Sequence, residues 1–236
     1  MSMHLHRDLE RLKKSLLSMG AMVEEATDKA ISSLVDRRVE LAQEVINGDD
    51  AIDRKEIQVE DECLKMLALH QPVAADLRFI VVVMKVNNDL ERMGDLAANI
   101  AERVMFLAKH EPIGVPLDFE IMAHTVRAMV AQALDSLVNR NPEAARQVLK
   151  LDDEVDTTHR KMYAILQDRM REDPAVIERA VQTLSASRHL ERIADLATNI
   201  AEDVVFMVEG NVIRHARSAP QGASETNSRP RPTSGR

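Results

Sequence analysis

The chain has 236 residues, of which 45% are apolar, only 2% are aromatic and none is Trp. Gly is scarce and Met is plentiful, which suits an all-helical protein and disfavours a β-sandwich. A net charge of −8 argues against a nucleic-acid-binding protein, which would usually carry a basic face. No apolar run approaches the roughly 18 residues of a membrane-spanning helix. We see no secretory signal at the N-terminus, and the single Cys63 suits a reducing cytoplasm.

The first half of the chain has apolar residues at helical spacing, interrupted by turn signals. Asn47-Gly48 is a typical helix stop, and Asp49-Asp50 can cap the helix that follows. Pro72 fits the first turn of a further helix. The expected helices are 5–35, 39–46, 49–69 and 72–109.

The same order of elements recurs after a segment with two prolines and a glycine. Asn141 is expected to cap a helix that begins at Pro142, and Asp173-Pro174 to begin the last one. The expected helices are 117–138, 142–150, 152–171 and 174–209. We therefore divide the chain into a first repeat (1–110), a linker (111–116), a second repeat (117–211) and a disordered tail (212–236).

An internal repeat is the strongest signal in the sequence. Residues 90–104 (LERMGDLAANIAERV) and 190–204 (LERIADLATNIAEDV) are identical at eleven of fifteen positions. Packing alone would preserve only the apolar stripe, yet polar residues match as well. They are Glu91/Glu191, Arg92/Arg192, Asp95/Asp195, Asn99/Asn199 and Glu102/Glu202. The sequence thus predicts an all-α fold of two tandem three-helix bundles that are related by the internal repeat and stack or pair side by side.

The matched polar residues form an acidic stripe. A helix turns by about 100° per residue, so Glu91, Asp95, Asn99 and Glu102 lie within about 80° of one another, as do their counterparts. Most such stripes are solvated faces. Here, however, acid follows acid at positions i and i+4 in both repeats, which costs roughly 0.2–0.5 kcal/mol per pair. A bound cation would reverse the sign of that cost.

Further acids are expected beside the stripe. If the second and third helices of each repeat form an antiparallel hairpin, Asp53 lies at nearly the same height as Glu91. The Asp pairs at 50/53 and 153/156 could equally be helix caps. Carboxylate and amide oxygens suit hard cations such as Mg, Mn, Ca or oxidised iron. The candidate ligands are Glu91, Asp95, Glu191 and Asp195, then Asp50, Asp53, Asp153, Asp156, Asn99, Asn199, Glu102 and Glu202.

Other chemical signals are weak. His159 follows Asp156 by three positions and is a candidate extra ligand, while Cys63 lies in an apolar pattern typical of a core. The paired Glu-x-x-His motifs of di-iron bundles are absent, as are a Gly-rich phosphate loop and an evident nucleophile–base pair.

One apolar segment favours an interface. Residues 79–84 are more apolar than their counterparts at 179–184. We expect this face to pack against another subunit or a partner, most simply in a homodimer, and deeper burial within the monomer is the alternative.

The doubled frame L-E-R-[IM]-x-D-L-A-x-N-I-A-E resembles the PhoU family over about residues 5–209. This resemblance implies multinuclear metal clusters on the acidic stripes, containing iron in some members, with Mn, Mg or Zn as other metals. The implied ligands are Glu91 and Asp95 in one repeat and Glu191 and Asp195 in the other. The family often has His after the Asp, whereas this chain has Leu96 and Leu196, which leaves these ligands in place.

The resemblance also implies a function. Such proteins are cytoplasmic and non-enzymatic, and they couple the ATPase of the phosphate-specific ABC transporter to a phosphate-sensing histidine kinase. They repress phosphate-starvation genes when phosphate is plentiful, and reach the inner membrane only through partners. Two other classes stay open: a carboxylate-bridged metalloenzyme, and a metal-free interaction module whose acidic face docks a basic partner.

Overall fold

The computed structural model describes residues 3–210, and the fold of this part is all-helical, as predicted. Its helices are α1 (Met3–Asp36), α2 (Val39–His70), α3 (Ala74–Leu107), α4 (Phe119–Asn139), α5 (Pro142–Glu172) and α6 (Ile177–Glu209), with a 3-10 turn (Pro174–Val176) before α6. Over the same residues no helix has the length and apolar content needed to cross a membrane. The predicted disordered tail lies outside the described residues.

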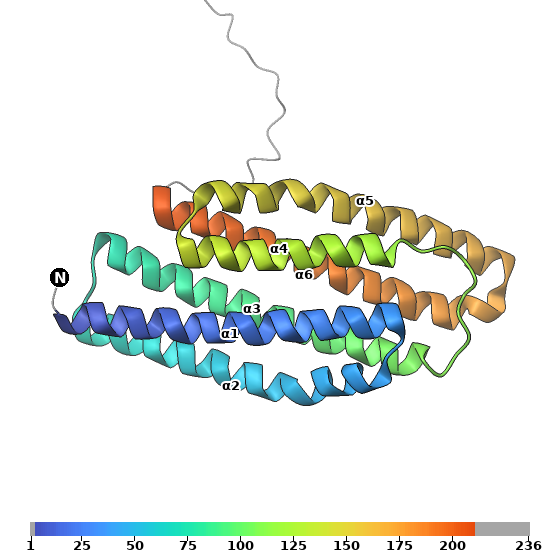
Figure 1. The fold of residues 1–236 in the computed structure, drawn as a ribbon, viewed down its shortest axis with the longest axis horizontal. Coiled ribbons are helices and arrows are strands. Elements are labelled where there is room, and N and C mark those ends of the chain that lie inside the picture. Colours follow the sequence, from blue (N-terminus) through green and yellow to red (C-terminus); the bar gives the residue numbers. More distant parts are fainter. Residues whose placement is uncertain (1–2, 211–236) are drawn as a thin grey trace, which may run out of the picture.

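The helices form two bundles, α1–α3 and α4–α6, that pack side by side in two layers (Figure 1). One layer contains α1 and α4. The other contains α3 and α6 in the middle, with α2 and α5 at its outer edges. The α2–α3 turn and the α5–α6 turn lie at opposite ends of the molecule (Figure 1). The expected pair of three-helix bundles is thereby confirmed.

The two bundles meet through α3 and α6, which run antiparallel. Lys85 Nζ on α3 lies 3.2 Å from the Asp203 carboxylate on α6, and Arg103 Nη1 donates to Gln182 Oε1 at 3.2 Å. The residue numbers rise along one helix as they fall along the other. This is the arrangement that a pseudo-twofold axis between matching helices requires.

The predicted breaks within the second and fifth helices are wrong, because α2 and α5 are continuous. In α2, Ala42 and Val45 before the predicted stop are buried on the same side as Ile52 and Val59 after it. That burial outweighs the cost of about 1 kcal/mol for Gly48 inside a helix. The Asp pairs at 49/50 and 152/153 therefore lie within helices and are not caps.

Some of the other helix starts that the sequence predicts are confirmed, and one is wrong. Asn141 caps α5 as expected, and its side chain accepts a hydrogen bond from the Ala144 N–H at 3.0 Å. Asp173 caps the 3-10 turn that leads into α6, accepting from the Ala175 N–H at 3.0 Å. Pro72 was expected in the first turn of α3, but it lies in the connection before that helix.

The apolar segment 79–84 is mostly buried inside the chain itself. Phe79, Ile80, Val82 and Val83 are buried, and only Val81 is exposed, at 37%. α3 is contacted by α1, α2 and α6, so it needs apolar residues on nearly every side. Burial within the monomer, the alternative, therefore accounts for most of this segment, and Val81 remains exposed for a contact with another subunit or partner. Cys63 is a core residue, as expected.

Two helical glycines have different surroundings, which generates a stability prediction. A Cβ at Gly48 would meet nothing within 4 Å, whereas a Cβ at Gly94 would approach Ile52 Cδ1 at 3.1 Å. We expect Gly48→Ala to raise the free energy of unfolding by about 0.5–1 kcal/mol, because alanine favours the helix. We expect Gly94→Ala to lower it, because the buried Ile52 has to move.

Urea unfolding followed by circular dichroism measures both effects. The second repeat has Ala194 and Val155 at the matching positions, so Ile52→Val should restore part of the stability lost in Gly94→Ala. Equal stability of Gly48→Ala and Gly94→Ala would contradict this account of the packing.

Candidate metal-binding face

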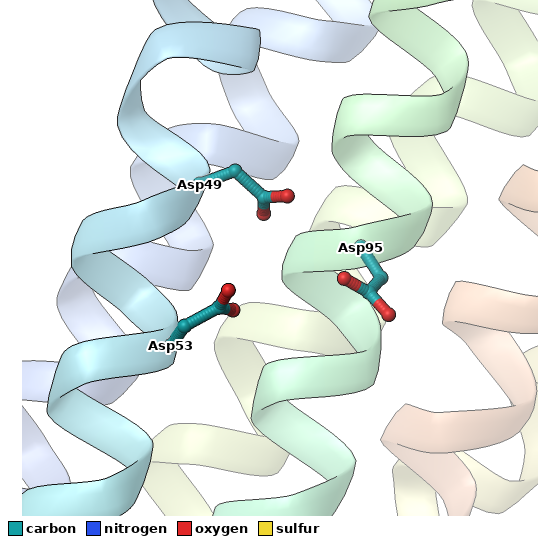
Figure 2. A group of neighbouring side chains, drawn as sticks. All are labelled: Asp49, Asp53 and Asp95. Carbon is teal, nitrogen blue, oxygen red and sulfur yellow. The ribbon is translucent and has the colours of Figure 1, made fainter.

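Carboxylates from α2 and α3 converge on the face of the α2–α3–α6–α5 layer that α1 and α4 do not cover. Asp49 and Asp53 project from α2 toward α3, on which Asp95 lies (Figure 2). Each of these three residues offers one carboxylate oxygen, and the three oxygens lie within 4.8 Å of one another. We call Asp49, Asp53, Asp95 and the neighbouring Glu91 the first acidic cluster.

The negative charges in this cluster repel one another. Burial raises the pKa of Asp49 to about 6, with further contributions from the charges of Asp95 and Asp53. Burial and the same two aspartates also raise the pKa of Glu91, first Asp95 and then Asp53. Within residues 3–210 none of the three aspartates forms a salt bridge with Lys or Arg. The cluster is thus a concentration of negative charge that the chain itself leaves uncompensated.

The second repeat brings the corresponding acids near one another, although within residues 3–210 only the first cluster has three carboxylate oxygens within 4.8 Å of one another. Burial raises the pKa of Asp195 to about 6, followed in size by the charges of Glu191, Asp152 and Asp156. Asp152 is itself buried, at 8% exposed. These four residues from α5 and α6 form the second acidic cluster.

The sequence placed most of the site residues well, with one systematic error. Glu91, Asp95 and Asp53 lie in the first cluster, and their counterparts lie in the second. Asp50 and Asp153 were expected in the clusters, but both are exposed. Asp49 and Asp152 take their places. In a continuous helix, position 49 shares a face with 53, whereas position 50 is rotated by about 100° from 49.

The remaining candidates lie around the clusters. Glu102 is one of the charges that raise the pKa of Asp49, although its own carboxylate also contacts Arg103 at 3.7 Å. Glu202 is half-buried and lies one turn beyond Asn199 on α6. Asn99 donates a hydrogen bond to the backbone oxygen of Asp95 at 2.8 Å.

Two matched contacts identify a further pair of residues. Asn87 donates to the backbone oxygen of Glu56 at 3.0 Å, and in the second repeat Ser187 Oγ lies 2.7 Å from His159 Nδ1. Glu56 is therefore the counterpart of His159, and its charge contributes to the raised pKa of Glu91. The sequence analysis did not single out Glu56 as a candidate ligand. Because Nδ1 of His159 contacts Ser187, only the Nε2 atom of this residue could bind a metal ion.

A groove lies between the two clusters, where α3 and α6 cross. It has a volume of about 400 Å³ and is lined by four matched pairs: Arg92/Arg192, Asp95/Asp195, Leu96/Leu196 and Asn99/Asn199. Because each pair contributes one residue from each repeat, the pseudo-twofold axis passes through this space. We call it the axial groove.

The donor set of the clusters fits hard cations. The ligand atoms are carboxylate oxygens, which Mg, Mn, Ca and oxidised iron prefer, and the partial exposure of the clusters leaves room for water ligands. Opposite charge nearby would favour the ionised carboxylates, whose pKa values are raised without it. A bound cation would therefore relieve the repulsion between these carboxylates.

Comparison with known proteins identifies relatives over nearly the whole chain. The PhoU domain matches residues 16–104 and 119–204, which contain both acidic clusters. The chain is 40% identical to the phosphate-specific transport system accessory protein PhoU homolog of Aquifex aeolicus, over 93% of this chain and 100% of that protein. It is 37% identical to the homolog of Pseudomonas aeruginosa, over 91% and 89%.

Solved structures agree with the sequence relatives. The crystal structure of PhoU from Pseudomonas aeruginosa matches with a TM-score of 0.85 and 36% identity, covering 87% of this chain and 99% of that one. The phosphate transport system regulatory protein PhoU from Streptococcus pneumoniae matches with a TM-score of 0.81 and 29% identity, covering 88% and 98%.

The raised pKa of Asp49 generates a prediction about stability and pH. The folded chain binds a proton at Asp49 between pH 3.8 and about 6, where the unfolded chain has lost it. The contribution of Asp49 to folding therefore becomes less favourable as pH rises through this window, and the cost is complete above it. In metal-free buffer, we expect Asp49→Asn to raise the free energy of unfolding by about 1 kcal/mol at about pH 7.5, after allowance for solvent screening.

Denaturant unfolding with a chelator present, at about pH 4.5 and about pH 7.5, measures the difference. The variant and the wild type should be closer in stability at the lower pH, where the wild-type carboxyl is largely protonated. A variant less stable than the wild type at the higher pH would contradict the repulsion.

Proposed function

Because the chain belongs to the PhoU family, we propose that it regulates phosphate uptake as an accessory protein of a phosphate-specific transport system. The observation that carries this proposal is the match of the PhoU domain to both repeats, including both acidic clusters. The relatives named above carry the same designation and align over most of their own lengths.

In detail, we propose a cytoplasmic, non-enzymatic negative regulator. It represses phosphate-starvation genes when phosphate is plentiful, by coupling the transporter ATPase to a sensor histidine kinase. Two features support a binding role: the rigid helical scaffold, and carboxylates that lie on an open face rather than in an enclosed reaction chamber. Regulation is then a change in which partner is bound.

Metal ions are part of this proposal. Asp49, Asp53, Asp95 and Glu91 would hold them in the first repeat, and Asp152, Asp156, Asp195 and Glu191 in the second. Mg, Mn and iron fit the oxygen donors, and Zn fits best beside His159 in the second repeat. Bound cations supply positive charge on an otherwise acidic face, to which an anionic group of a ligand or partner can attach.

Exposed apolar residues support binding of protein partners. Leu69 and Val73 at the α2–α3 turn are 77% and 74% exposed. The matched pairs Leu77/Ile177 and Val81/Val181 are exposed in both repeats. Clustered exposed apolar side chains typically mark interaction surfaces. In this proposal the ends of the α2–α3–α6–α5 layer contact the transporter or the kinase.

Deletion of the gene in its own host tests the regulatory role. We expect alkaline phosphatase and transporter expression to stay high in phosphate-replete medium, because the repressing coupling is lost. The intact gene, supplied in trans, should restore repression. Expression that remains low in the deletion strain, with no second copy of the gene in the genome, would refute the regulatory proposal.

Metal binding tests the clusters. Equilibrium dialysis against Mn²⁺, followed by elemental analysis, should show that Asp53→Asn/Asp95→Asn loses about half of the metal bound by the wild type, because one of two clusters is removed. Asp50→Asn/Asp153→Asn is the matched control, since it removes the same charge from exposed neighbours that are not among the three converging aspartates. It should bind metal as the wild type does.

The metal-binding and repression measurements also distinguish the proposed function from the two alternative functions. A wild-type chain that binds no metal yet restores repression would favour an interaction module whose acidic face docks a basic partner. Turnover that depends on Glu91 would favour a metalloenzyme.

A further inference from the structure

The axial groove contains two arginines that form no hydrogen bond or ion pair within the described part of the chain. Arg92 and Arg192 are exposed and line the same groove from opposite sides of the axis. Neither forms a hydrogen bond or an ion pair with another of residues 3–210, whereas arginines elsewhere on the surface, such as Arg127 and Arg146, pair with acids. The two guanidiniums are therefore available to a ligand.

The lack of internal pairing is informative because acids lie within reach. Asp95 and Asp195 line the same groove, yet neither forms an ion pair with an arginine there. An oxygen of Asp95 lies within 4.8 Å of two α2 carboxylates, and Asp195 is influenced by the charges of Glu191, Asp152 and Asp156 as well as by Arg192. The groove is therefore lined by guanidinium donors and by carboxylates that also belong to the acidic clusters, where cations would bind.

We infer that the axial groove is a binding site for one phosphate group, held by Arg92 and Arg192 on the axis and by cations of the two acidic clusters on its flanks. Guanidinium groups bind phosphate oxygens through paired, charge-assisted hydrogen bonds. Asn199 adds a side-chain amide to the lining of the groove, while the amide of Asn99 is bound to its own helix. A volume of about 400 Å³ admits a phosphate ion with several waters.

Cations are a necessary part of the site. Without them, the carboxylates of the two clusters outnumber the two arginines of the groove and would repel an anion. Cations in both clusters would offset much of this negative charge and could bind phosphate oxygens directly. The inference therefore rests on the proposed function, and it specifies what the metal ions on this face are for.

The location on the axis fixes the stoichiometry. The groove is built from both residues of each matched pair and exists once per chain, so one phosphate should bind per chain. If phosphate instead bound to each metal cluster independently, two would bind. Both arginines should contribute to the single site.

Isothermal titration of the full chain with inorganic phosphate, in the presence and absence of Mn²⁺, tests the site. We expect one phosphate per chain with Mn²⁺ and no saturable binding without it. Arg92→Gln/Arg192→Gln should weaken binding at least about tenfold, since two charge-assisted contacts are lost. Arg92→Lys/Arg192→Lys should be intermediate, because lysine keeps the charge but loses the planar fork.

The matched control is Arg11→Gln/Arg54→Gln, which removes the same charge from exposed positions outside the groove and should bind phosphate as the wild type does. Phosphoserine, titrated in parallel, distinguishes the source of the phosphate group. Affinity equal to that of inorganic phosphate means that the groove accepts a phosphorylated side chain of a partner. Much weaker binding means that it is specific for the free ion.

Three outcomes would overturn the inference: no saturable phosphate binding to the Mn²⁺-loaded chain, two phosphates per chain, or equal affinities for the glutamine variant and its control. Mn²⁺ binding is measured first. A chain that binds Mn²⁺ but no phosphate contradicts only the groove site. A chain that binds no Mn²⁺ contradicts the metal clusters of the proposed function as well.

Discussion

The antiparallel packing of α3 against α6 decides where every charged group of the functional face lies. The two helices carry the same sequence frame and run in opposite directions, so matching residues appear on one face, on either side of an axis. Parallel packing about an axis along the helices would have placed the two clusters on opposite faces of the layer. Antiparallel packing instead brings Asp95 and Asp195 into one groove, together with both arginines of the matched frame. The groove thus belongs to neither repeat alone.

Apolar burial supplies the free energy that holds the carboxylates together. Leu90, Met93 and Ala97 are fully buried on the opposite side of α3, and they fix the rotation of that helix so that Glu91 and Asp95 face α2. Full burial of one Leu or Met side chain contributes about 1.5–3 kcal/mol. Repulsion between partly exposed carboxylates costs about 1 kcal/mol or less per pair. Apolar burial therefore outweighs the repulsion between the carboxylates and holds them close together. A cation bound between them would reduce that repulsion.

The helices, the repeat and the acidic stripe could be predicted because each is a local or periodic property of the sequence. The break at Asn47-Gly48 was wrong because a local stop signal competes with tertiary packing, and burial of Ala42 and Val45 prevailed. That one error moved the ligand set by one position, from Asp49 to Asp50. The axial groove could not be predicted at all, since it depends on how two helices cross.

The repeats have diverged in compensating pairs where they touch. With identical repeats, Lys85 would face an arginine at the position of Asp203, because Arg103 is the counterpart of that residue. The substitution turns a repulsive contact into an ion pair with a carboxylate that is only 2% exposed. Gly94 against Ile52, compared with Ala194 and Val155, is a similar exchange of volume. Packed residues can therefore differ between the two repeats when their neighbours change with them. The identity of Arg92 and Arg192, which are exposed and pack against nothing, needs another cause, and a ligand shared across the axis provides one.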